Sequence, residues 1–247
     1  MKATIERATL LRSLSHVQSV VERRNTIPIL SNVLIDADEG GGVKVMATDL
    51  DLQVVETMTA ASVESGGAIT VSAHLLFDIA RKLPDGSQVS LETADNRMVV
   101  KAGRSRFQLP TLPRDDFPVI VEGELPTSFE LPARELAELI DRTRFAISTE
   151  ETRYYLNGIF LHVSDEQRPV LKAAATDGHR LARYTIDRPE GAAGMPDVIV
   201  PRKAVAELRK LLEEALDSNV QIDLSASKIR FALGGEGGVV LTSKLID

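Results

Sequence analysis

Hydrophobic and polar positions along this chain repeat in a pattern that predicts four similar structural units. Four times, a short apolar stretch typical of a β-strand runs directly into an amphipathic segment with helical spacing, over residues 4–14, 69–79, 129–139 and 198–208. The equivalent apolar positions are Ile5, Val71, Leu131 and Val200 in the strands, and Leu10, Leu76, Leu136 and Val205 in the helices. Pro132 and Pro201 are expected in the first turn of a helix, where proline is tolerated, and Ser72 as an N-cap.

Alternating apolar and polar residues follow each predicted helix. Period-two alternation bounded by Asp, Asn and Gly is typical of antiparallel strands with one buried face. These predicted strands cover residues 32–38, 43–49, 52–60, 88–93, 96–102, 105–111, 158–164, 170–177, 180–187, 219–225, 228–233 and 239–245. The repeating unit is therefore one strand, one helix and three strands. We expect an α+β fold, with helices on one side of antiparallel sheets.

A longer repeat indicates two homologous domains. Ala47-Thr48-Asp49 recurs as Ala175-Thr176-Asp177, 128 positions later, and three other segments correspond in order at offsets of 125, 129 and 131. The Pro-rich stretch 109–127 separates the two copies. We expect domains over residues 1–120 and 128–247.

Composition excludes several classes of protein. The 247 residues include no cysteine, which excludes disulfides and cysteine-based metal sites and fits a reducing cytoplasm. There is no run of eighteen apolar residues and no signal-peptide pattern, so neither a transmembrane helix nor secretion is expected. The four histidines (His16, His74, His162 and His179) are far apart and show no metal-binding spacing. We therefore expect no metal or cofactor.

Charge is segregated between the predicted elements. The helical segments with their flanks, 1–24, 72–83, 132–145 and 201–215, hold fourteen Lys and Arg against nine Asp and Glu, a net charge of +5. The formal net charge of the chain is −7, which leaves −12 for the remainder. A surface lined by these helices would be mildly basic and could contact phosphates without sequence preference. The alternative is that helices are rich in Lys and Arg through propensity alone.

The stretch "ATDGHRLA" (175–182) places Asp177 close to His179, a combination that also occurs in hydrolases. A catalytic interpretation needs a nucleophile or a metal, and no cysteine or Gly-x-Ser-x-Gly motif is present. Asp177 and Gly178 are also typical of a hairpin turn. Because Thr-Asp recurs at Asp49 without a histidine, the repeated pair is interpreted as structural. A hydrolase using Asp177 and His179 stays as the less favoured alternative.

Several segments, in order over the whole chain, resemble the bacterial DNA polymerase III beta subunit, the replicative sliding clamp. They are "ERRNTIPILSNVLI" (22–35), "GRSRFQLPTLPRDDFP" (103–118), "RYYLNGIFL" (153–161), "ATDGHRLA" (175–182), "VIVPRK" (198–203) and "LTSKLID" (241–247). The resemblance implies three domains per protomer and a homodimeric ring whose helices face duplex DNA. This chain holds two such domains, so by the resemblance it is expected to lack the third and not to close a ring alone.

The resemblance also implies site residues, none of them catalytic. Residues expected to face DNA are Arg24, Arg153, Tyr154, Arg202 and Lys203, with Glu150 and Glu151 nearby weakening that contact. Residues expected in a groove for partner peptides are Leu156, Thr176, Gly178, His179, Arg180 and Leu181. Residues expected at the dimer interface are Ile79, Arg104, Arg106, Phe107 and Leu109, on or beside an edge strand. From the residues alone, the cations could equally be solvated surface charges, and Phe107 and Leu109 could be core residues.

The expected function is thus that of a non-enzymatic processivity subunit of a DNA-directed DNA polymerase holoenzyme. It would encircle DNA without sequence specificity and recruit polymerase, clamp loader and repair proteins through short peptides. A net-acidic protein can do this, since a closed ring is retained by topology rather than by affinity. The alternative from a different class is an interaction scaffold that does not bind DNA.

Overall fold

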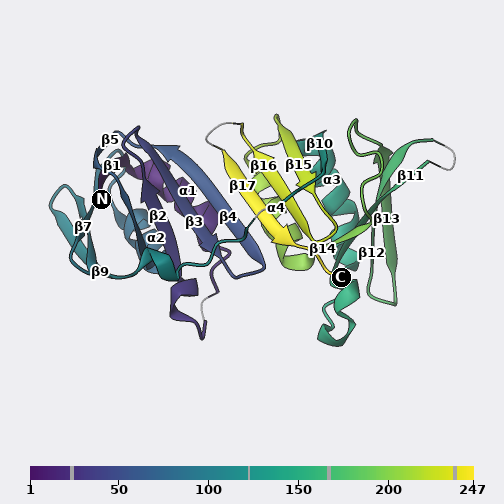
Figure 1. Ribbon diagram of the computed structural model, residues 1–247, viewed down its shortest axis with the longest axis horizontal. Coiled ribbons are helices and arrows are strands. Elements are labelled where there is room, and N and C mark those ends of the chain that lie inside the picture. Colours follow the sequence, from purple (N-terminus) through teal and green to yellow (C-terminus); the bar gives the residue numbers. More distant parts are fainter. Residues whose placement is uncertain (23–24, 122, 166–167, 236–237) are drawn as a thin grey trace. The chain divides into compact units, whose positions relative to one another are not determined.

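The computed structural model describes residues 1–22, 25–121, 123–165, 168–235 and 238–247, which fold into two compact units (Figure 1). Unit 1 contains residues 1–120 with 238–239, and unit 2 contains the residues from 121 to 235 with 240–247. Each unit combines helices with antiparallel strands, so the α+β fold predicted from the sequence is confirmed.

Unit 1 consists of two copies of the predicted motif. The first copy is β1 (Lys2–Glu6), α1 (Arg7–Gln18), η1 (Pro28–Ser31), β2 (Asn32–Ala37), β3 (Gly42–Thr48) and β4 (Leu52–Thr59). The second copy is β6 (Gly67–Ser72), α2 (Ala73–Lys82), β7 (Gln88–Ala94), β8 (Arg97–Ala102), β9 (Ser105–Leu112) and η2 (Arg114–Asp116). The short strand β5 (Ser62–Ser65) pairs with β1 and lies between the copies in sequence.

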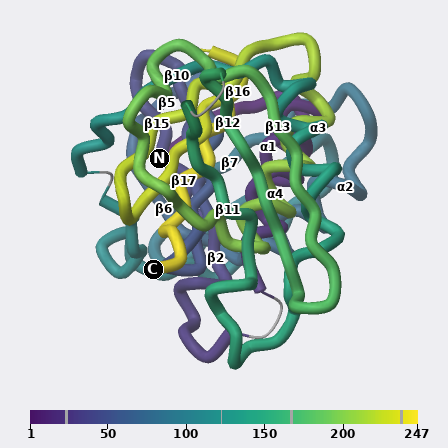
Figure 2. Tube along the Cα trace, turned by 90° about the vertical axis from the view of Figure 1, so that its right-hand side faces the viewer, coloured from purple at the N-terminus to yellow at the C-terminus, as the bar shows by residue number. Residues whose placement is uncertain are grey.

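Unit 2 repeats this organisation. Its first copy is β10 (Thr127–Pro132), α3 (Ala133–Thr143), η3 (Arg144–Ala146), η4 (Glu151–Leu156), β11 (Gly158–Ser164), β12 (Val170–Thr176) and β13 (Leu181–Asp187). Its second copy is β14 (Val198–Pro201), α4 (Arg202–Glu213), β15 (Asn219–Leu224), β16 (Lys228–Leu233) and β17 (Val239–Lys244). Strands β11, β12 and β13 run side by side (Figures 1 and 2).

The first strand of each copy pairs with the strands of the other copy. In unit 1, β1 lies beside β7 and β6 lies beside β2, with Ile5 opposite Val89 and Val33 opposite Val71. In unit 2, β10 lies beside β15 and β14 beside β11. Each copy therefore completes the sheet of its neighbour, which joins the two copies of a unit into one fold. Periodicity predicts the elements but not this exchange.

The helices begin where the sequence places capping residues. Ser72 accepts a hydrogen bond from the N–H of Leu75 at the start of α2, as predicted. Pro132 and Pro201 stand at the N-cap of α3 and α4, one position before the predicted first turn. Proline is suited to this boundary because its missing N–H has no helical partner there.

The helices bury their apolar faces against the sheets. In unit 1, α1 and α2 contact each other and bury Leu10, Leu14 and Leu76. In unit 2, residues of α3 and α4 meet the inward side of the sheets around Ile159 and Phe231. Burial of such side chains stabilises a fold by about 1.5–3 kcal/mol each. The sheet face opposite the helices is then free to carry a site.

In the described part of the chain, no helix is long and apolar enough to span a bilayer. The longest α-helices, α1 and α4, have twelve residues each. A helix of this length extends roughly 18 Å, against about 30 Å for the hydrocarbon core.

Candidate functional site

Residues Asp177 to Arg180 form the turn between β12 and β13. Thr176 donates its hydroxyl hydrogen to the backbone carbonyl of Arg180 at 2.7 Å and accepts from the N–H of Gly178 at 3.1 Å. Asp177 Oδ1 accepts from the N–H of His179 at 2.9 Å and of Arg180 at 3.0 Å. The predicted hairpin turn is confirmed, and the Thr-Asp pair holds its backbone.

The same turn occurs in unit 1 between β3 and β4. Thr48 donates its hydroxyl hydrogen to the carbonyl of Leu52 at 2.9 Å and accepts from the N–H of Leu50 at 3.1 Å. Asp49 Oδ1 accepts from the N–H groups of Asp51 and Leu52 at 3.0 and 2.7 Å. Four equivalent hydrogen bonds in both units identify the repeated Thr-Asp as structural.

The geometry around Asp177 does not form a catalytic pair. Its second oxygen, Oδ2, accepts from Nε of Arg180 at 3.0 Å. The two backbone N–H donors of the turn, with the Arg180 guanidinium, lower the pKa of Asp177 from 3.8 to about 2. The carboxylate is thus committed to the turn and is a poor proton acceptor at neutral pH. No hydrogen bond joins it to the imidazole of His179, where an orienting carboxylate would bind.

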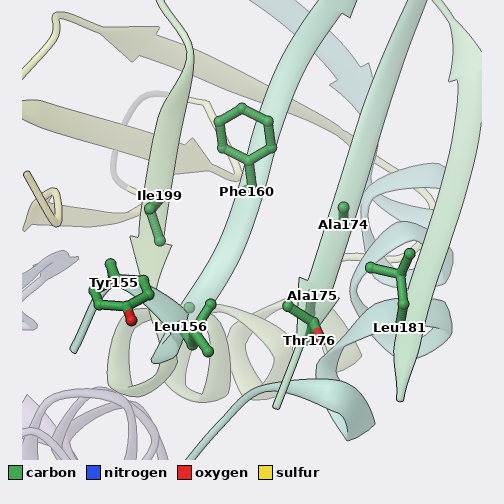
Figure 3. Close-up of a pocket in the computed structure, with 9 residues that line it drawn as sticks. Tyr155, Leu156, Phe160, Ala174, Ala175, Thr176, Leu181 and Ile199 are labelled. Carbon is green, nitrogen blue, oxygen red and sulfur yellow. The ribbon is translucent and has the colours of Figure 1, made fainter. Parts of the chain in front are cut away.

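An apolar pocket of about 160 Å³ opens beside this turn, on unit 2 (Figure 3). Its wall comes from η4 on one side and from β14, β11, β12 and β13 in that order. Figure 3 shows Leu181 at one end of this row of strands and Ile199 at the other, with Tyr155 and Leu156 below. The lining residues are Tyr155, Leu156, Gly158, Phe160, Ala174, Ala175, Thr176, Leu181 and Ile199.

Strand pairing brings the pocket residues together. Phe160 lies opposite Ala174 on β12 and opposite Ile199 on β14. Alternation along β11 turns Ile159 toward the helices and Phe160 to the other side of the sheet. At Gly158 the strands approach so closely that a Cβ would lie 2.3 Å from the carbonyl oxygen of Val200. Glycine at this position allows β14 to pack against the start of β11.

Three of the residues expected in the peptide groove line this pocket. Leu156, Thr176 and Leu181 line the pocket, whereas Gly178, His179 and Arg180 lie in the turn outside it. The lining residues missed by sequence reasoning are Tyr155, Gly158, Phe160, Ala174, Ala175 and Ile199. Period-two alternation could have placed Phe160 and Ala174 on the outward face, but it does not say which outward positions meet.

Exposed apolar side chains line the pocket or contact residues next to it. Leu181 is 71% exposed although it is large and apolar. Tyr154, Tyr155 and Phe145 are also exposed, and the guanidinium of Arg180 stacks on the Phe145 ring at 5.7 Å. A cluster of exposed apolar groups with a polar rim is typical of a binding surface.

Four of the five residues expected to contact DNA lie in η4 and at the start of α4. Arg24 lies outside the described residues. Arg153 and Tyr154 lie in η4 and are exposed, and Arg202 is the exposed first residue of α4. The end of η4 reaches α4, because Asn157 accepts from the Arg202 N–H at 2.8 Å. Lys203, the next residue of α4, is half-buried.

Several of the helix cations are ion-paired. Asp141 of α3 accepts from Arg209 of α4, at 3.0 Å to both Nε and Nη2, and from Arg144 at 2.9 Å. Arg153 pairs at 3.1 Å with Glu150, one of the two acidic residues expected to weaken DNA contact there. Such pairs reduce the positive charge that the helical segments offer to a polyanion. Contact with phosphates through this surface would therefore be weak.

Strand β9 is an edge strand over most of its length, as predicted. From Ser105 to Pro110 it pairs with β8, and within the described residues its other edge meets β6 only at Thr111 and Leu112. Phe107 is 38% exposed, whereas Leu109 is 1% exposed. Leu109 is thus buried within unit 1, in agreement with the core interpretation, and contributes no exposed side chain to this edge.

The other residues expected at the dimer interface differ in exposure. Arg106 is exposed on β9, and Arg104 lies in the exposed turn that precedes the strand rather than within it. Ile79 of α2 is largely buried. The exposed part of the expected interface is therefore Phe107 with the two arginines.

No group of three or more His, Cys, Asp and Glu is arranged to hold a metal ion among the residues that the structure describes.

The fold and the pocket define a class: pairs of α+β domains, each built from two exchanged strand-helix-three-strand motifs, with an apolar pocket on the sheet side of the second. Residues 1–121 match the N-terminal domain of the DNA polymerase III beta subunit, and residues 130–247 match the central domain. The chain belongs to this family, which confirms the resemblance noted in the sequence.

Individual relatives support the same family assignment. The chain is 54% identical to the beta sliding clamp of Caulobacter vibrioides strain NA1000 / CB15N, over 100% of this chain and 66% of the relative. It is 37% identical to that of Escherichia coli K12, over 100% and 65%. The crystal structure of the Bartonella birtlesii sliding clamp bound to griselimycin matches with a TM-score of 0.96 and 53% identity, over 100% of this chain and 65% of that one. The chain thus spans just under two thirds of these relatives.

Proposed function

We propose that this chain supplies two domains of a cytoplasmic sliding clamp, a non-catalytic subunit that encircles duplex DNA and tethers the replicative polymerase. The observation that carries the proposal is the family match over both domains, with 54% identity to a beta sliding clamp across the whole chain. The internal repeat supports it, because evenly repeated domains can be arranged around a central axis.

The charge distribution is compatible with a clamp that slides. The chain has a formal net charge of −7, while its helical segments are positive. Ion pairs such as Asp141 with Arg209 moderate that positive surface. A ring is retained on DNA by its closed topology, so weak contacts suffice and leave it free to move. Arg153, Tyr154, Arg202 and Lys203, with Arg24, are the residues proposed to contact phosphates.

The test is retention of the full-length protein on DNA of different topology. After loading onto nicked circular DNA, the protein should stay bound through gel filtration at high salt and dissociate once the circle is linearised. Equal loss from circles and linear DNA would contradict the clamp. Retention of polymerase-binding activity with no DNA retention would instead favour an interaction scaffold.

We propose further that the pocket on unit 2 binds short apolar peptide segments of polymerase, clamp loader and repair proteins. Its apolar lining and the exposed Leu181 support this proposal. The Bartonella relative is bound to griselimycin in its crystal structure, so griselimycin is a suitable probe. In NMR spectra of the chain, addition of griselimycin should shift the methyl resonances of Leu181 and Ile199. Leu181→Ala should weaken binding several-fold, and unchanged affinity would exclude this pocket.

The edge of β9 is proposed to join two protomers of the full-length protein. Its unpaired backbone and the exposed Phe107 suit extension of a sheet across an interface. Phe107→Asp should shift the full-length protein from dimer to monomer in sedimentation equilibrium. An unaltered dimer would exclude this edge.

A further inference from the structure

Unit 1 contains a counterpart of the unit 2 pocket at the same place in the repeated fold. The strand registers establish the correspondence: Leu34 lies opposite Met46 and Thr70, as Phe160 lies opposite Ala174 and Ile199. The 3₁₀ segment that precedes the strand corresponds as well, with Ile29 and Leu30 of η1 preceding β2 as Tyr155 and Leu156 of η4 precede β11.

The unit 1 counterpart is filled by the chain itself. Phe117, five residues beyond β9, is buried in a cluster with Ile29, Leu30 and Leu34. Met46, Ala68 and Leu112 pack against this cluster. The aromatic ring of Phe117 therefore lies on the residues that correspond to Tyr155, Leu156 and Phe160.

The segment that carries Phe117 is held at both ends by polar side chains. At one end, Thr70 donates its hydroxyl hydrogen to the carbonyl of Leu112 at 2.8 Å, and Asn32 donates to the Thr70 hydroxyl at 3.1 Å. At the other end, the N–H of Ile120 donates to Oε1 of the buried Gln53 at 2.9 Å. The segment Leu112–Ile120 is thus seated across the site like a bound peptide.

The anchoring residues are replaced in unit 2. Thr70 corresponds to Ile199, and Gln53, which lies opposite Thr48, corresponds to Leu181, which lies opposite Thr176. Asn32 corresponds to Gly158, since they lie opposite Ser72 and Pro201. Unit 1 has polar groups that hold the backbone of its own segment, whereas unit 2 has apolar groups and an open pocket.

We propose that Leu112–Ile120 is an internal peptide ligand that occupies a second copy of the pocket. Phe117 is its anchor, because its ring is buried on Ile29, Leu30 and Leu34 directly after the 3₁₀ turn η2 (Arg114–Asp116).

Native-state hydrogen exchange of the chain with Phe117→Ala tests the unit 1 site. If the segment is a docked ligand, loss of its anchor opens the segment alone. If Phe117 is a core residue, its loss destabilises the whole of unit 1. Protection of the Ile120 amide should fall by roughly 100-fold or more, as expected for loss of a buried Phe, while the amides of Val45 and Val54 in β3 and β4 stay protected. A fall of equal size at all three amides would overturn the proposal. Val119→Ala, an exposed change in the same segment, should alter none of them.

Addition of a synthetic peptide with the sequence of residues 112–120 separates the two sites. On the Phe117→Ala chain it should shift the resonances of Leu34 and Met46, and a peptide with alanine in place of its phenylalanine should not. Absence of any shift at Leu34 would overturn the internal-ligand proposal. In the same titration, Leu181 and Ile199 report on unit 2. Shifts at Leu181 and Ile199 without shifts at Leu34 would place the peptide in the unit 2 pocket alone and would overturn the internal-ligand proposal.

Discussion

Leu50 and Gly178 occupy the same position in the repeated turn, with φ of 83° and 88°. Both N–H groups donate to the hydroxyl of the preceding threonine, at 3.1 Å in each case. The turn thus requires left-handed backbone at this position, which glycine adopts freely and leucine does not. Unit 2 has the relaxed version and unit 1 the strained one.

Exchange of these residues should therefore have opposite effects on stability. Leu50→Gly should raise the free energy of unfolding by about 0.5 kcal/mol, because relief of the left-handed strain exceeds the entropy that glycine loses. Gly178→Ala should lower the free energy of unfolding by about 1–2 kcal/mol. The added Cβ would also lie 2.9 Å from Nη1 of Arg153, so the Arg153 side chain would have to move. Urea denaturation of both variants checks this. Loss of stability in both variants would show that the side-chain contacts of Leu50 stabilise the chain by more than the left-handed strain costs.

Asp177 should make the stability of unit 2 depend on pH in the acid range. Its pKa is lowered from 3.8 to about 2 in the folded state by the two backbone N–H donors of the turn and by Arg180. The stabilising contribution of the carboxylate is therefore present above the unfolded pKa and is lost as the pH falls toward 2. Asp177→Asn should lower Tm at pH 7, and its difference from the wild type should shrink between pH 4 and pH 2. A difference that is constant with pH would contradict the assignment.

Ser13 is a buried polar residue of α1 whose replacement should be tolerated. Its hydroxyl is buried and has no hydrogen-bond partner in the described part of the chain. Burial of an unsatisfied hydroxyl costs about 1–3 kcal/mol, and alanine also favours the helix. Ser13→Ala should therefore leave Tm unchanged or raise it. The control is Ser15→Ala in the same helix, where the exposed hydroxyl donates to the carbonyl of Arg12 at 2.6 Å. A strongly destabilised Ser13→Ala chain would show that the hydroxyl has a bound partner.

Asp141 should limit the affinity of the helical surface for DNA. The Asp141 carboxylate pairs with both Arg144 and Arg209 and offsets part of their positive charge. Asp141→Asn should strengthen binding to duplex DNA at low salt and steepen the salt dependence, by about 0.9 in the log–log slope for each additional phosphate that is neutralised. Fluorescence anisotropy over a salt series measures the slope. Asp165→Asn makes the same change of charge at an ion pair with Arg188, outside the helices, and should leave the slope unaltered. Equal slopes for both variants would exclude α3 and α4 as the DNA-facing surface.

Much of the fold could be predicted from local pattern. The four helices, the antiparallel strands and the turn at Asp177 each depend on short-range spacing and on capping or turn residues, which the sequence displays directly. The exchange of β1 and β6, and of β10 and β14, depends on pairing between residues far apart in the chain, such as Ile5 with Val89. Periodicity carries no information on such partners.

The site was predictable only in part for the same reason. Leu156, Thr176 and Leu181 were found through the family resemblance, and they do line the pocket. Phe160 and Ile199 face outward by alternation, but only the register of β11 with β14 brings them together. Phe107 and Leu109 lie on the same face of β9 by alternation, yet Phe107 is exposed and Leu109 is buried. Along an edge strand, alternation alone did not decide which side chains reach the core.

Primer extension on a long single-stranded template tests the central claim most directly. The replicative polymerase and its clamp loader should make long products in one binding event only when the full-length protein is present. Leu181→Ala, a change at an exposed side chain of the pocket, should shorten these products toward the length made without the protein. Products of the same length with and without the wild-type protein would contradict the assignment of this chain to a processivity clamp.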